Sequence, residues 1–227
     1  MSATRIARDW APLAGLLALG VVPTIAGIVR LHDIAALSET AATARFHAAP
    51  VPIVLHVIGS LVFALAGALQ FAPRLRRRPG LHRRLGRVAL PAGVLSVMSG
   101  LWMTLTYPWP PGDGHALFAI RLVVGAVMLV QLLLGVAAIR RRDFALHGRW
   151  MTRAYALGMG AGTQVLTHLP VALMGITPGV TLRAVLMATG WGINAIVAES
   201  LIRARAGPSR SGARSLPVSR ARRPVRA

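Results

Sequence analysis

The sequence predicts an all-α membrane protein: a bundle of six transmembrane helices with a four-helix core made by the second to fifth helices. Only 14% of the 227 residues are charged and 55% are hydrophobic, whereas a soluble domain has about 25% charged residues. Several uncharged apolar runs are long enough to cross a bilayer, which requires roughly 20 residues. These observations exclude a soluble enzyme and indicate a polytopic protein of the cell's inner (plasma) membrane.

The apolar runs and the breaks between them define the helices in order. We expect helices at residues 11–30, 51–73, 84–107, 116–140, 148–170 and 181–202. The first run is longer than the 7–15 apolar residues of a signal peptide, so we expect it to be retained; cleavage near the Ala-Thr-Ala at 42–44 is the alternative. Three prolines and two glycines between Pro108 and Gly114 end the third helix. The tail at 203–227 is rich in Arg, Ser and Pro, and we expect it to be disordered.

Arginine accounts for all 26 basic residues and is unevenly distributed. Twenty-two arginines lie before the first run, at 74–87, at 140–153 and from 203 onward, which are alternate boundaries of the apolar runs. This positive-inside pattern predicts cytoplasmic N- and C-termini and anionic lipids as partners on that side. The net charge of +20 does not predict nucleic-acid binding, because the arginines flank membrane spans rather than cover a soluble surface.

A weak internal repeat supports the four-helix core. A shift of 65 residues places His82 and its neighbouring arginines onto His147 and its neighbours, so helices 2–3 and 4–5 are expected to form related pairs. Pro79 and the N-cap candidate Asp143 place both histidines in first helical turns. We therefore expect His82 and His147 to face one shared site at the cytoplasmic boundary.

The histidines fall into two layers that could bind a cofactor. His56, His115 and His168 lie near the outer surface, and His82 and His147 near the inner one. Histidines on different helices can ligate haem iron, and we prefer His56 with His168 for a haem b whose propionates pair with Arg121 and Arg183. The inner pair suits quinone or a lipid headgroup better. In the alternative interpretation these residues only anchor the helices in the headgroup layer.

The second helix has a distinctive stripe on one face. It consists of His56, Gly59, Phe63, Gly67 and Gln70, and the third helix has Gly86, Gly93 and Gly100 at heptad spacing. Such glycines allow another helix or a flat ligand to approach closely.

Three further groups of polar residues could have functional roles. The candidates for binding an anionic headgroup or ligand are Arg83, Arg84, Arg87, Arg149 and Arg153. The polar groups inside spans are Gln70, Asn194 and Glu199, and we expect Glu199 to form a structural ion pair with an inner arginine. A metal site formed by His32, Asp33, Glu39 and His47 is not favoured because these residues lack a recognised ligand spacing. We therefore expect no metal beyond a haem iron, and the absence of cysteine excludes covalently attached haem.

The leading functional interpretation is a b-type haem or quinone-linked electron-transfer protein. The alternative is a non-enzymatic transporter, lipid-binding or membrane assembly protein that uses its cytoplasmic His-Arg loops. The sequence leaves enzymatic activity, the electron donor and the oligomeric state open.

The chain also resembles the bacterial integral membrane protein family known as domain of unknown function 2306. The similarity covers about 51–202, and its most specific part runs from His147 to Leu157. The matching residues are His56, Gly67, Gln70-Phe71, His82-Arg83, Gly86-Arg87, Arg141-Arg142-Asp143, His147, Arg149-Trp150-Met151, Arg153, Ala156-Leu157, Trp191, Asn194 and Ala198-Glu199. The resemblance implies a membrane protein and a role for the inner His-Arg elements, without an established activity.

Overall fold

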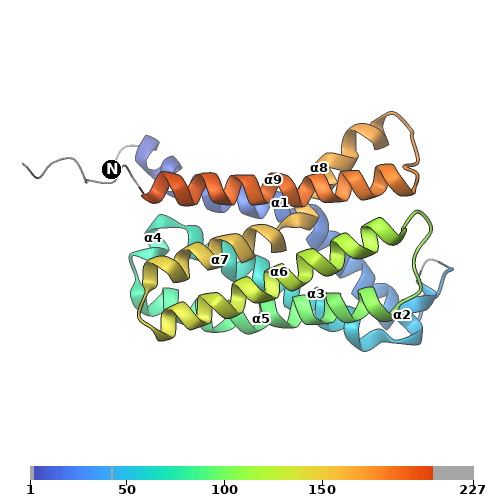
Figure 1. Ribbon diagram of the computed structural model, residues 1–227, viewed down its shortest axis with the longest axis horizontal. Helices are drawn as coiled ribbons and strands as arrows, with labels where there is room; N and C mark the ends of the chain where they lie inside the picture. The colour runs from blue at the N-terminus through green and yellow to red at the C-terminus, as the bar shows by residue number, and fades with distance from the viewer. Residues whose placement is uncertain (1–2, 42, 207–227) are drawn as a thin grey trace, which may run out of the picture.

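The computed structural model describes residues 3–41 and 43–206, and every regular element in that part of the chain is a helix (Figure 1). The elements are α1 (Ala3–Ala35), α2 (Ala44–Ala48), α3 (Pro50–Phe71), α4 (Pro73–Arg76), α5 (Pro79–Thr106), α6 (His115–Arg140), α7 (Phe144–Gly158), α8 (Gly160–Leu173) and α9 (Val180–Ala206).

The prediction of an all-helical membrane bundle is confirmed. Five helices are long and apolar enough to cross a membrane, namely α1, α3, α5, α6 and α9. The fifth predicted span, 148–170, corresponds to α7 and α8 together, so the expectation of one continuous helix there is wrong. Helix α9 continues to Ala206, four residues into the segment expected to be disordered, and the rest of that tail lies outside the described residues.

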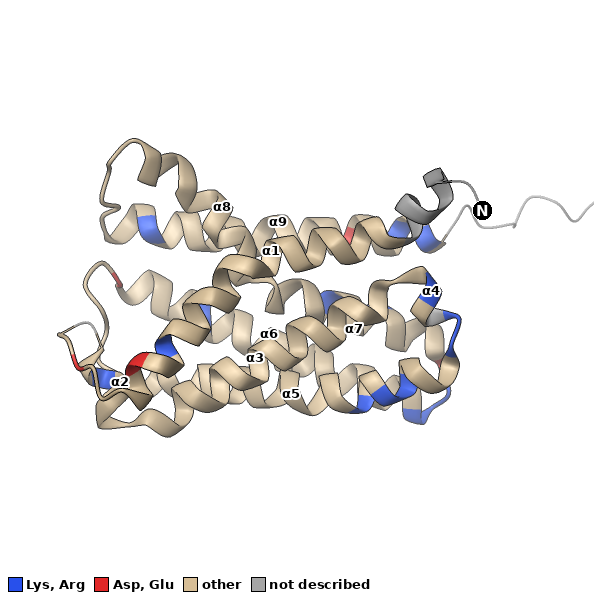
Figure 2. Ribbon diagram, turned by 180° about the vertical axis from the view of Figure 1, so that it is seen from behind, with Lys and Arg blue, Asp and Glu red and all other residues tan. Residues whose placement is uncertain are grey.

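The helices form two layers with α1 crossing between them. Helices α3, α5, α6 and α7 lie in one layer, and α8 and α9 lie over it (Figure 1). Helix α1 runs obliquely from the side of α9 to the side of α2 (Figure 2), and it packs against both α3 and α8. The fifth span therefore begins in one layer and ends in the other.

The main apolar core joins the predicted four-helix set. Most of its buried members come from α3, α5, α6 and α7, with Leu13 of α1 and the connecting residues Ala72 and Met159 added, and they include Phe63, Ala92, Leu132 and Tyr155. Moving a large apolar side chain from water into a protein core stabilises a soluble protein by roughly 1.5–3 kcal/mol. In a membrane the unpacked side chain already lies in lipid, so the stabilisation comes from close packing between helices instead. The predicted helix pairs are present as two hairpins, α3 with α5 and α6 with α7.

The glycine stripes of α3 and α5 pack against each other. A Cβ atom on Gly59 would lie 2.9 Å from the Ala92 carbonyl oxygen, and one on Gly93 would lie 2.8 Å from the Phe63 ring. These positions need glycine because the two helices approach so closely. The stripe therefore serves helix packing over most of its length.

Two glycines flank the break between α7 and α8, at Met159. A Cβ on Gly160 would lie 2.2 Å from the Trp191 indole nitrogen of α9. Asn194 of α9 donates from Nδ2 to the Ala156 carbonyl at 2.9 Å, and its Oδ1 accepts from the Thr163 hydroxyl at 2.7 Å. Because carbonyls in the last turn of a helix lack intrahelical partners, Asn194 satisfies a backbone group that the break would otherwise leave unpaired within the membrane.

Candidate functional site

A cavity of about 550 Å³ lies between the two layers, toward the end of the molecule that carries α2. Its walls come from α1, α3, α5, α6 and α8, from α9, and from the loop before α6. The lining is mostly apolar, and its polar side chains include His56, Ser60, Ser96 and Thr104. Such a chamber suits a largely apolar molecule that has a few polar groups.

His56 lines this cavity and has a fixed ring orientation. Its Nδ1 lies 2.8 Å from the Ser96 carbonyl oxygen of α5. Because a carbonyl only accepts, Nδ1 carries the proton in the neutral ring and Nε2 keeps its lone pair. Gly100 leaves room for the ring, since a Cβ there would lie 3.1 Å from His56 Cε1. The hydrogen bond to Ser96 thus fixes the ring orientation of His56 at the cavity wall.

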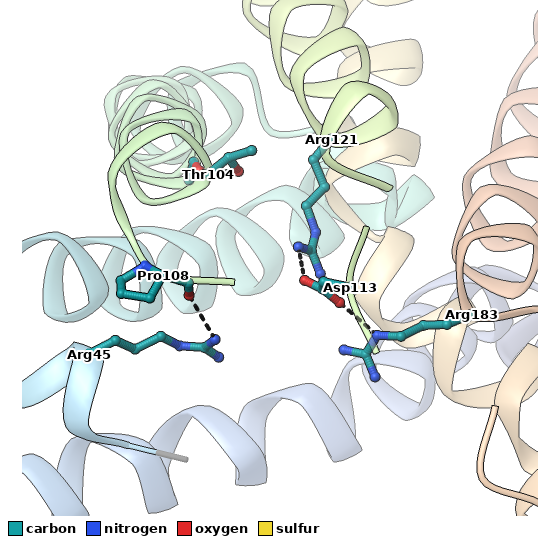
Figure 3. Close-up of polar contacts among 7 residues, drawn as sticks. Arg45, Thr104, Pro108, Asp113, Arg121 and Arg183 are labelled. Carbon is teal, nitrogen blue, oxygen red and sulfur yellow. Dashed lines mark hydrogen bonds and ion pairs between the residues drawn. The ribbon is translucent and has the colours of Figure 1, made fainter. Parts of the chain in front are cut away.

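The mouth of the cavity, at the α2 end, carries an arginine cluster around one carboxylate (Figure 3). Asp113, whose side chain is 2% exposed, accepts from Arg121 of α6 and from Arg183 of α9, the latter at 2.7 Å. One carboxylate therefore joins the loop before α6 to helices from both layers. Two cations on one anion leave this pair of contacts with a net positive charge.

Arg45 of α2 increases that positive charge. Its Nη1 donates to the Pro108 carbonyl at 3.4 Å, and its guanidinium lies 4.6 Å from the centre of the Phe46 ring, which also contacts Arg30 at 4.9 Å. Burial lowers the pKa of Arg45 below its usual value, and the nearby Asp113 opposes that shift. The mouth of the apolar cavity therefore carries a net positive charge from Arg45, Arg121 and Arg183. Such a site suits the carboxylate or phosphate of an amphiphile.

The other outer histidines lie elsewhere. His168 Nδ1 donates to the Gln164 carbonyl of its own helix at 2.7 Å, and His115 packs edge-on against Trp109. Among the described residues that line the cavity, His56 is the only histidine. The structure thus places His56 and Arg121 at one cavity and does not bring His168 or His115 into its lining.

The inner histidines occupy equivalent positions in their helices. His82 is the fourth residue of α5 and His147 the fourth residue of α7, and Asp143 caps α7 by accepting from the Leu146 amide at 2.8 Å, as predicted. His147 Nδ1 lies 2.8 Å from the Gly135 carbonyl of α6. Its ring is therefore anchored on α6, whereas α5 packs mainly on α3. A site shared by His82 and His147 stays a prediction.

The remaining candidates at the arginine-rich end divide into exposed and paired residues. The exposed ones are Arg83, Arg84, Arg87 and Arg149. Arg153 makes a two-point ion pair with Glu199 of α9, through Nε at 2.5 Å and Nη2 at 3.0 Å, and it stacks on Trp150. This is the structural ion pair expected for Glu199. Gln70 lies against Gly86, with its Nε2 3.0 Å from the place of a Cβ there.

The sequence predicted Arg121 and Arg183 as partners of one ligand, but Asp113 and Arg45 were missed as members of their cluster. Asp113 and Arg121 are eight residues apart and Arg183 lies on another helix, so no helical spacing brings them together. The only sequence signal for this cluster was that a few isolated charged residues lie at the boundaries of the apolar runs where the net charge is close to zero. Among the described residues, no group of three or more His, Asp or Glu side chains could hold a metal ion.

Comparison with known proteins yields one match. No curated protein and no solved structure matches the chain. The family described as predicted membrane protein (DUF2306) matches residues 53–202, which is more than half of the chain and extends from the start of the His56 stripe to the Glu199 ion pair. The helical bundle, its apolar spans and this match together place the chain in the DUF2306 family of predicted membrane proteins.

Proposed function

We propose that the protein binds a b-type haem in the outer cavity, with His56 as an axial ligand, and that it takes part in electron transfer at the membrane. The observation that supports this most is the hydrogen bond from His56 Nδ1 to the Ser96 carbonyl. Metal-ligating histidines commonly donate their second ring nitrogen to a backbone carbonyl or carboxylate, which fixes the tautomer and leaves the other nitrogen for the metal.

The charged mouth supports the same ligand. Haem is an amphiphile with an apolar macrocycle and two carboxylates, and the cavity combines apolar walls with an arginine cluster at one end. Each guanidinium has five N–H donors, so Arg121 and Arg183 keep donors free while they bind Asp113. Arg121 is thus proposed as a propionate partner, together with Arg45 and Arg183.

We propose only one histidine ligand, His56, and assign no second histidine to the haem iron. Since His168 bonds to its own helix and does not line the cavity, the expected His56–His168 pair has less support than His56 alone. A quinone is the natural lipid-soluble electron donor or acceptor for such a haem protein.

We further propose that both chain termini face the cytoplasm. The arginine-rich segments lie at the opposite end from this cavity (Figure 2), and such segments are usually retained on the cytoplasmic side.

A visible absorption spectrum tests the haem proposal. Protein purified from cells supplied with haem is expected to have a Soret band that shifts on reduction. His56→Phe is expected to lose that band, while His115→Phe, outside the cavity lining, keeps it and serves as the control. Circular dichroism of each variant checks that the helices are retained. A colourless wild-type preparation with adequate haem would contradict the proposal.

A second candidate function is favoured by the charge balance at the mouth. Three arginines against one aspartate also suit a fatty acid or another single-chain amphiphile with an anionic head. This corresponds to the transporter or lipid-binding alternative, but the binding site is the cavity mouth at the α2 end and not the arginine-rich loops. Binding of a fluorescent fatty acid that depends on Arg121 and Arg183 but not on His56 would favour it over haem.

A further inference from the structure

A second hollow, separate from the cavity, runs along the lipid-facing side of the α5–α6 pair. Its walls are entirely aliphatic apart from one methionine, and they comprise Leu90, Pro91, Val94, Leu95, Met98, Leu132, Leu133 and Val136. The side chains of Leu95, Met98 and Leu133 are 38%, 50% and 56% exposed. Pro91 lacks an amide hydrogen and lies inside α5, where it removes one helical hydrogen bond. We call this hollow the α5–α6 groove; it is open, apolar and not filled by protein side chains.

Arginines continue both walls of the α5–α6 groove toward the arginine-rich end. Arg87 lies three residues before Leu90, and Arg140 lies four residues after Val136. Residues three or four apart share one face of a helix, so both arginines extend the faces that form the groove. Both are exposed.

The charges around the α5–α6 groove are of one sign. Neither α5 nor α6 contains an acidic residue. The nearest carboxylate in sequence, Asp143, is occupied as the N-cap of α7. A phosphate would therefore find two guanidinium forks at the end of the groove, whereas a choline or ethanolamine group would find no anion on these helices.

We propose that the α5–α6 groove binds one anionic phospholipid, with an acyl chain along the aliphatic walls and the phosphate between Arg87 and Arg140. Pockets of basic residues between membrane helices at the cytoplasmic surface are a recognised setting for acidic lipid headgroups. This site is independent of the outer cavity and of haem, because the two hollows share no lining residue.

Electron spin resonance of spin-labelled lipids tests the site in reconstituted vesicles of phosphatidylcholine. The wild type is expected to restrict the motion of added phosphatidylglycerol more than that of phosphatidylcholine. An arginine beside an anionic leaflet contributes roughly a fivefold preference, so the double variant Arg87→Gln/Arg140→Gln is expected to lose about tenfold or more of this selectivity. Both substitutions are on exposed side chains, so folding should persist, and circular dichroism verifies it.

Two further variants make the test specific. Arg149→Gln/Arg203→Gln removes the same charge at the same end from exposed positions on α7 and α9, and it is expected to retain the selectivity. An equal loss in this control would overturn the proposal, since the preference would then reflect surface charge alone. Val94→Phe, which fills the groove and keeps the arginines, is expected to reduce the restricted phosphatidylglycerol. An unchanged restricted fraction in Val94→Phe would overturn the placement of the acyl chain.

Discussion

Asp113 is the single residue on which the outer end depends most. Its carboxylate is almost fully buried and accepts from two guanidiniums on helices of different layers. Removing one partner from a buried ion pair leaves charges uncompensated, and the cost is then larger than the net contribution of the pair itself. At the residue scale, therefore, Asp113 ties the loop before α6 to helices of both layers, while Arg45 and Tyr107 add hydrogen bonds at the start of the same loop.

Asp113→Asn tests this dependence. The neutral amide cannot balance Arg121 and Arg183, so the free energy of unfolding is expected to fall by about 1–3 kcal/mol, below the fully buried limit because both arginines are partly exposed. Asp33→Asn, which removes a half-exposed i,i+3 pair with Arg30, is the control and should cost less than about 1 kcal/mol. Thermal unfolding in detergent measures both. Equal effects of the two substitutions would contradict the special role of Asp113.

The α7–α8 break is the feature that matters most at the scale of elements. It allows the fifth span to leave the four-helix core and pack on α9 instead. The contact depends on Gly160, which gives the Trp191 ring space against the backbone, and on the Asn194 bridge to Ala156. Without these contacts the cavity would lose the α8 part of its wall.

Glycine-to-alanine substitutions in the two halves of this span are expected to act in opposite directions. Gly160→Ala places a methyl group 2.2 Å from the Trp191 ring nitrogen, and overpacking of this kind costs about 1–3 kcal/mol. Gly148→Ala, with open space around its Cβ inside α7, is expected to be neutral or stabilising by up to about 1 kcal/mol. Midpoints of thermal unfolding compare the two. A stabilised Gly160→Ala would show that Trp191 does not hold the junction.

Periodicity and length predicted the elements well, but not the break within the fifth span. Apolar run length decides whether a helix crosses lipid, so the spans from Pro50 to Arg140 were predicted to within a few residues. The break at Met159 depends on Trp191 and Asn194, which lie more than thirty residues away. Likewise, His56 was predicted as a site residue because histidine is rare inside a span, but the Asp113 cluster depends on tertiary contacts alone.

At the scale of the whole molecule, the two ends differ in charge. Arginines crowd the α4 end (Figure 2), whereas Asp33, Glu39 and Asp113 lie in the segments at the α2 end. The arginine-rich end is expected to face the cytoplasm, because positive residues are retained there during insertion. The candidate cavity would then open toward the opposite surface.

Single-cysteine labelling checks this orientation, since the natural chain has no cysteine. Glu39→Cys and Arg78→Cys introduce thiols at exposed positions at opposite ends. In intact cells a membrane-impermeant maleimide is expected to label Glu39→Cys and to spare Arg78→Cys. Both should react once the membrane is opened with detergent, which confirms that each thiol is accessible. The reverse labelling pattern in intact cells would refute the proposed topology.

The break in the fifth span also has a consequence for the order in which the chain enters the bilayer. Helices α7 and α8, with 15 and 14 residues, are each too short to cross a membrane alone. Three of their polar side chains have partners on α9: Arg153 with Glu199, Thr163 with Asn194, and Gln164 with the Met187 carbonyl. Polar groups in hydrocarbon need such partners. The fifth span and α9 are therefore expected to enter the lipid together as one hairpin. In a growing chain, the fifth span is expected to wait at the insertion machinery until α9, which begins at Val180, has been synthesised.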